Sequence, residues 1–203
     1  MKLVRFIGVV VLGVLALGAV GVAGASAHEF TSTVTGKGTV AKNNTQVFTA
    51  GGSTVECTEV ALDSNAESGS HPSVELSVLY KKCEFKALGG LIKGAATVSL
   101  ADYTFFAEPE VSILNVNILI DVPSVSCSVT VFSGQKLAKG AGELTYENKG
   151  NNVVLKSNVK EIEWSRLNEG SGSCAAGTTG REKGATYTGE VEAGVAGGAI
   201  SWK

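Results

Sequence analysis

Two histidines suggest chemistry most directly, because the 203-residue chain contains only His28 and His71. His28 follows the small-residue stretch 24–27, and cleavage after Ala27 makes it the first residue of the mature chain. A free α-amine and the imidazole of the same residue can chelate one copper ion, with a second histidine as a further ligand. A copper-dependent redox enzyme or a copper carrier that uses His28 and His71 is therefore one hypothesis for this chain.

Other catalytic motifs are missing from the sequence. It contains no G-x-S-x-G nucleophile elbow, no H-E-x-x-H zinc motif and no G-x-x-x-x-G-K-[ST] phosphate loop. The acids Glu108 and Glu110 form a clustered carboxylate pair beside a proline, and solvated turn charges explain them without a hydrolase. Ser70 and His71 lie together in a polar stretch that favours an exposed loop. We therefore expect no catalytic residues and favour a non-enzymatic protein, with enzymatic activity as the alternative.

The four cysteines indicate an oxidised, exported protein. An even cysteine count in an exported chain favours two disulfides, and four cysteines allow three connectivities. Pairing between sequence neighbours is the favoured one. No two cysteines have the close spacing that a zinc site requires. The predicted pairs are Cys57 with Cys83 and Cys127 with Cys174.

Residues 1–27 have the pattern of a cleaved signal peptide. Lys2 and Arg5 precede an apolar run from Phe6 to Ala23, and an Ala-x-Ala site follows at once. A single transmembrane anchor is the alternative, because about 18 apolar residues can just span a bilayer. The cleavage site favours export, with residues 28–203 as a single secreted domain.

The mature chain is mildly acidic. Removing the two basic residues of the leader leaves 15 basic and 19 acidic residues, a net charge of −4. Such a surface has no basic footprint for nucleic acid or for anionic lipid. We expect a monomer that is secreted or loosely held in the envelope, with no nucleic-acid partner and no membrane contact after signal cleavage.

Hydrophobic alternation with period two runs through the mature chain and predicts strands separated by glycine-rich turns. Residues 51–85 resemble a long hairpin in which Cys57 faces inward and the Cys57–Cys83 disulfide would join the two strands. Residues 63–73 are expected to form a loop. The apolar stretch 111–120 changes phase, and a β-bulge near Ile113 and Leu114 would restore one buried face. The pattern predicts an all-β fold, an antiparallel β-sandwich or a barrel-like fold with two disulfides.

Several short phrases are similar to a large, uncharacterised group of small secreted, cysteine-stapled β-rich proteins of high-GC Gram-positive bacteria. Members of that group often carry two more cysteines, in segments that match residues 101–103 and 121–123, and both are absent here. The resemblance implies a disulfide-stapled β fold and no assigned activity. The phrases are Ala27-His28-Glu29-Phe30, Gln46-Val47-Phe48-Thr49, Val55-Glu56-Cys57-Thr58, Tyr80-Lys81-Lys82-Cys83, Cys127-Ser128-Val129-Thr130 and Thr186-Tyr187-Thr188-Gly189.

These observations favour a secreted, non-enzymatic extracellular or cell-envelope β module without a cofactor. Its ligand is unknown, and we expect its loops to bind a surface, a glycan or a protein. In the copper-binding alternative, the arrangement of His28 and His71 would resemble the histidine brace of lytic polysaccharide monooxygenases and of some periplasmic copper carriers. Those proteins are also exported β-sandwiches.

Overall fold

The computed structural model describes residues 28–122, 125–137, 142–169 and 180–203. The predicted signal peptide and Cys174 lie outside these residues. Sixteen strands and one short 3-10 segment, η1, make up the described chain. They are β1 (Phe30–Ser32), β2 (Gly36–Asn43), β3 (Gln46–Ala50), β4 (Ser53–Leu62), β5 (Asn65–Ala66), β6 (Gly69–His71), β7 (Ser73–Ala87), η1 (Leu88–Gly90), β8 (Ile92–Val98), β9 (Ala101–Phe106), β10 (Glu110–Val122), β11 (Val125–Val131), β12 (Gln135–Leu137), β13 (Gly142–Lys149), β14 (Asn152–Glu169), β15 (Glu182–Val195) and β16 (Ile200–Trp202).

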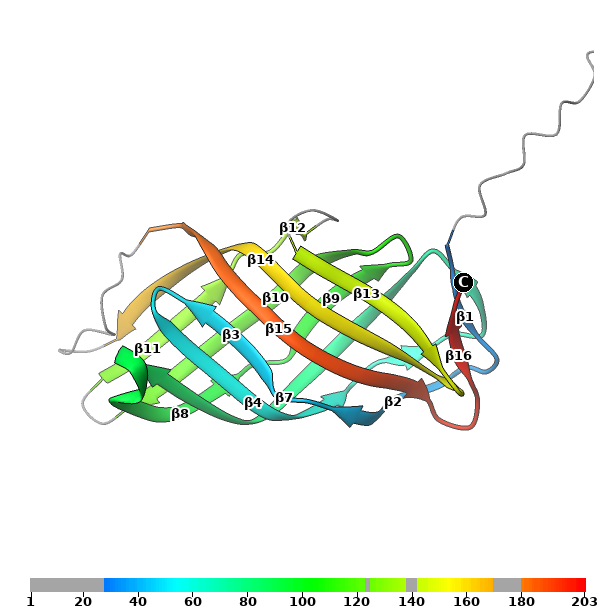
Figure 1. Ribbon diagram of the computed structural model, residues 1–203, viewed down its shortest axis with the longest axis horizontal. Helices are drawn as coiled ribbons and strands as arrows, with labels where there is room; N and C mark the ends of the chain where they lie inside the picture. Colours follow the sequence, from blue (N-terminus) through cyan, green and yellow to red (C-terminus); the bar gives the residue numbers. More distant parts are fainter. Residues whose placement is uncertain (1–27, 123–124, 138–141, 170–179) are drawn as a thin grey trace, which may run out of the picture.

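The large sheet is antiparallel and closes on itself (Figure 1). Neighbouring strands run in the order β14, β11, β10, β8, β7, β4, β3 and β15, and β15 pairs again with β14. The long strands have different neighbours along their length. In β7, for example, residues 73–78 pair with β9 and residues 83–87 pair with β8. The predicted all-β antiparallel fold is confirmed, and of the two expected architectures the structure has the barrel-like one.

A second, three-stranded sheet lies at one end of the closed sheet, beside the C-terminus (Figure 1). Its central strand β1 pairs with both β16 and β6. Phe30 on β1 is buried and contacts the Tyr146 ring edge-on. The expected loop at residues 63–73 is therefore wrong in part, because β5 and β6 lie within it. They are too short for period-two alternation to be visible in the sequence.

The predicted bulge in β10 is confirmed. The pairing register between β9 and β10 shifts between Ile113 and Asn115, so that Leu114 is the extra residue. The Leu114 side chain is 42% exposed. One face of β10 therefore stays buried on both sides of the shift, and its buried apolar residues are Val111, Ile113, Val116, Ile118 and Ile120.

The interior of the closed sheet is densely filled at the end opposite β1. Trp164 on β14 is 1% exposed, and the Arg166 guanidinium lies 5.1 Å from its ring centre. Gly51 makes this packing possible. Its φ is +54°, and a Cβ atom there would lie 2.6 Å from the Arg166 side chain.

The predicted hairpin disulfide is confirmed. Cys57 on β4 and Cys83 on β7 are directly opposed in the sheet and are bonded. Cys127 is buried, but its predicted partner Cys174 lies outside the described residues, so the second pair stays a prediction. Within the part of the chain that the structure describes, no helix has the length and apolar character needed to cross a membrane.

Candidate functional site

A cavity with two adjoining chambers lies inside the closed sheet. The outer chamber has a volume of about 370 Å³ and lies at the end that carries β1 and β6. The inner chamber has a volume of about 80 Å³ and lies among apolar side chains of the interior. The two chambers adjoin because they share lining residues, which are Leu62, Leu76, Phe105, Leu155 and Ala193.

The alternation of β7 and the small residues of β15 create this space. Successive side chains of a strand point to opposite faces, so every second residue from Val74 to Tyr80 lines one of the chambers. On β15, Ala193 and Gly194 line the outer chamber and occupy little volume. The sequence therefore leaves room between strands that are otherwise packed with apolar residues.

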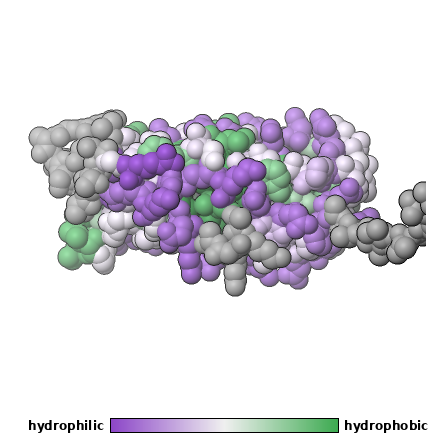
Figure 2. All heavy atoms as spheres, turned by 90° about the horizontal axis from the view of Figure 1, so that it is seen from above, coloured by the Kyte–Doolittle hydropathy of each residue, from purple (hydrophilic) through white to green (hydrophobic). Residues whose placement is uncertain are grey.

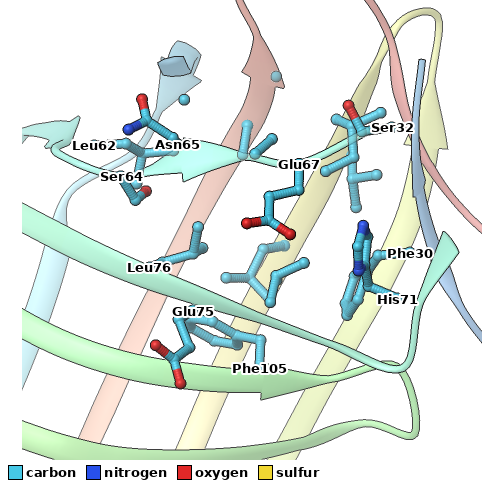
Figure 3. A pocket seen from close by; sticks show the side chains of 18 of the residues that line it. Phe30, Ser32, Leu62, Ser64, Asn65, Glu67, His71, Glu75, Leu76 and Phe105 are labelled. Atoms are coloured by element: carbon cyan, nitrogen blue, oxygen red, sulfur yellow. The ribbon is translucent and has the colours of Figure 1, made fainter. Parts of the chain in front are cut away.

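Four polar side chains stand out in the outer chamber. The Ser64 hydroxyl and His71 Nε2 are buried and have no hydrogen-bond partner among the described residues. A buried polar atom without a partner costs about 1–3 kcal/mol. Glu67 also lines the chamber, and Glu75 lies at its edge with its side chain on the outward-facing side of β7, and both residues are exposed. Figure 3 shows the Glu67 carboxylate and the His71 ring extending into the space beside Phe30 and Leu76. The chamber therefore combines an apolar wall with a small group of polar atoms at one side.

Three tyrosine hydroxyls form a hydrogen-bonded chain across the interior. Tyr80 Oη lies 3.1 Å from Tyr103 Oη and donates to Tyr187 Oη at 3.2 Å. Tyr187 Oη donates to Gln46 Oε1 at 2.5 Å. Gly189 allows this contact, because a Cβ there would lie 2.6 Å from Gln46 Cδ. Each of the three tyrosines lines the inner chamber.

Burial keeps these tyrosines protonated. Loss of solvation raises the pKa of Tyr187 to about 12, and it raises the pKa of Tyr80 and of Tyr103 further above the ordinary tyrosine value. The hydroxyls are therefore neutral near pH 7. They serve as hydrogen-bonding groups at that pH and not as general bases.

The two histidines predicted to bind copper lie on the small sheet or next to it. His28 stacks on the Trp202 ring with 4.7 Å between ring centres, and its Nδ1 lies 2.9 Å from the Lys203 carbonyl oxygen. His71 is on β6, opposite Phe30, and lines the outer chamber, so the expectation that it lies in an exposed loop is wrong. Within the described ranges no three potential metal ligands cluster together. A brace needs only two histidines and the α-amine, so copper binding stays a prediction.

The acid pair Glu108 and Glu110 does not line the cavity. Both residues are in or next to the turn between β9 and β10. Glu110 forms an ion pair of 3.5 Å with Lys136 on β12.

Nothing in the sequence singled out Glu67, Ser64 or the hydroxyl chain of the three tyrosines. The alternation of β7 gave a signal for Tyr80, which it placed on the same face as Val74 and Leu76. Tyr103 and Tyr187 come from distant strands, so only the closed sheet brings their hydroxyls together. Glu67 and Ser64 lie in the stretch interpreted as a loop.

An exposed apolar tip is the other feature of the surface. Leu88 and Leu91, at the turn between β7 and β8, are 59% and 87% exposed. Figure 2 shows a largely hydrophilic face with a hydrophobic patch at the end of the molecule that carries η1. This tip lies at the opposite end from the outer chamber.

Comparisons with known proteins add no relative. No family model matches the chain, and searches of curated proteins and of solved structures found no match.

Proposed function

We propose that this chain is an exported, non-enzymatic binding module that holds a small, largely apolar molecule in the cavity of its closed sheet. The observation that carries the proposal is the outer chamber, whose volume of about 370 Å³ falls in the range typical of small-molecule sites. Its apolar wall and few convergent polar atoms are typical of such sites. The ligand is thus proposed to bind inside the closed sheet, and not on the loops that the sequence suggested as the binding surface.

The apolar wall can supply part of the binding free energy. Burial of a ten-carbon chain is worth about 8 kcal/mol at about 0.8 kcal/mol per methylene group. Association and ordering cost at least about 4 kcal/mol, so at most about 4 kcal/mol remains. That corresponds to a Kd of about 1 mM at the tightest, so hydrogen bonds to the polar atoms of the chamber are needed for tighter binding.

Titration with N-phenyl-1-naphthylamine, whose fluorescence rises in apolar surroundings, tests the proposal. We expect a saturable signal with one site per chain. Leu76→Trp places a large ring in the wall shared by the two chambers and should weaken binding at least tenfold. Leu119→Trp is the matched control, because Leu119 is 45% exposed and lines neither chamber.

Circular dichroism of both variants must match that of the parent protein, so that loss of the fold is not mistaken for loss of the site. A signal that does not saturate, or one that the two substitutions weaken equally, contradicts a ligand in the cavity.

A further inference from the structure

The polar atoms of the cavity define the ligand more narrowly. We infer that the ligand carries a hydrogen-bond-donating polar end without negative charge, and that an aliphatic amine fits the cavity best. This inference rests on the proposed function, because it concerns the same two chambers.

The charges of the lining are the first argument. Glu67 lines the outer chamber, and Glu75 lies at its edge on the outward-facing side of β7. The described residues that line the two chambers include no lysine or arginine. On neighbouring β2, Lys37 lies 3.6 Å from Asp63, and neither Lys37 nor Lys42 lines a chamber. A carboxylate in the wall and a second one at its edge, without a basic neighbour in the wall, favour a cation and disfavour an anion.

The unpartnered atoms are the second argument. An ammonium group has three N–H donors and no acceptor. The Ser64 hydroxyl oxygen, the Glu67 carboxylate and, in the tautomer with the proton on Nδ1, His71 Nε2 can each accept one hydrogen bond. An alcohol satisfies one of these acceptors with its single donor, and a carboxylate ligand satisfies none as a donor.

The direction of the tyrosine chain is the third argument. The Gln46 amide nitrogen donates to the carbonyl oxygens of Asn44 and Glu190, which leaves Oε1 to accept from Tyr187. Tyr187 accepts from Tyr80, so the Tyr80 proton is already used. The proton between Tyr80 and Tyr103 must then belong to Tyr103.

As a result, the Tyr103 oxygen keeps a free lone pair at the end of the chain, beside the inner chamber. The inner chamber thus offers a ligand an acceptor and no spare donor from this chain. Both chambers therefore favour a donor in the ligand.

Competition among three probes with the same ten-carbon chain tests the inference. Decylamine, decanol and decanoate are titrated against protein loaded with N-phenyl-1-naphthylamine, at pH 7.5 and 0.15 M salt. We expect decylamine to bind at least tenfold more tightly than decanoate, with decanol between them. In the double variant Glu67→Gln and Glu75→Gln, the affinities of amine and carboxylate should come within about threefold of each other.

Glu84→Gln is the matched control. Glu84 lies on β7 like Glu75 but lines neither chamber, so the preference for the amine should persist. Decanoate binding as tightly as decylamine, or an unchanged preference in the double variant, overturns the inference and leaves the proposed function standing. Absence of saturable binding by every probe, including the fluorescent one, overturns the proposed function itself.

Discussion

The two ends of the closed sheet are built by the same strands and filled differently. On β14, Trp164 is 1% exposed at the end opposite β1, whereas Leu155 lines both chambers at the other end. Ala185 on β15 is fully buried near the packed end, whereas Ala193 on the same strand borders the cavity. One end is a packed core, and the other end encloses the cavity.

This difference indicates where stability and binding reside. Protein interiors usually pack as densely as organic crystals, with few voids larger than a water molecule. A chamber of about 370 Å³ with buried, unpartnered polar atoms is unfavourable unless something fills it. We therefore expect substitutions at the packed end to affect folding, and substitutions at the open end to affect binding.

The largest contrast is expected between Trp164→Ala and Leu76→Ala. Loss of the buried Trp164 ring should lower the free energy of unfolding by about 3–5 kcal/mol, the usual cost of such a cavity. Leu76 already faces open space, so its truncation should cost less than about 2 kcal/mol. Urea unfolding monitored by circular dichroism measures both values. Equal losses for the two variants would contradict the division into a packed and an open end.

Loss of the disulfide should have the next-largest effect on stability. Replacing Cys57 and Cys83 together by alanine opens a loop of 26 residues and should lower the free energy of unfolding by about 3.5 kcal/mol in the chain-entropy model. Neither cysteine lines the outer or the inner chamber, so the variant should still bind N-phenyl-1-naphthylamine while folded. Denaturant unfolding and probe titration of the same sample test both parts. Loss of binding in a folded variant would show that the bond shapes the cavity.

For each buried tyrosine, a smaller effect is expected from alkaline pH. Burial raises the pKa of Tyr187 to about 12 in the folded protein, against about 10 for a tyrosine in the unfolded chain. Between these values the unfolded chain binds fewer protons, so stability is intact below pH 10 and falls as pH rises. Each buried tyrosine should contribute about 1.4 kcal/mol per pH unit.

Tyr103→Phe should make the free energy of unfolding fall less steeply with pH, by the contribution of one tyrosine, because the pKa of Tyr103 is also raised by burial. Unfolding free energies measured from pH 9 to 12 give the slope, and absorbance of tyrosinate follows the titration directly. A parent protein with constant stability across this range would contradict the burial of the tyrosine chain.

Much of the fold could be predicted from local pattern. Alternation placed Cys57 on the inner face of a hairpin that runs to Cys83, and the phase change in 111–120 located the bulge near Leu114. Both predictions depend on residues close together in the sequence. The candidate site was predicted poorly, because Tyr80, Tyr103 and Tyr187 meet only through pairings between distant strands.

The sequence by itself determined the class of fold and the inward face of most long strands, because period-two alternation states which side of a strand is apolar. Only the tertiary structure decided that β15 returns to β14 and closes the sheet. The same holds for β6, whose pairing with β1 turns His71 into a wall of the cavity. Alternation does not specify which strands become neighbours, and the space between them depends on how the sheet closes.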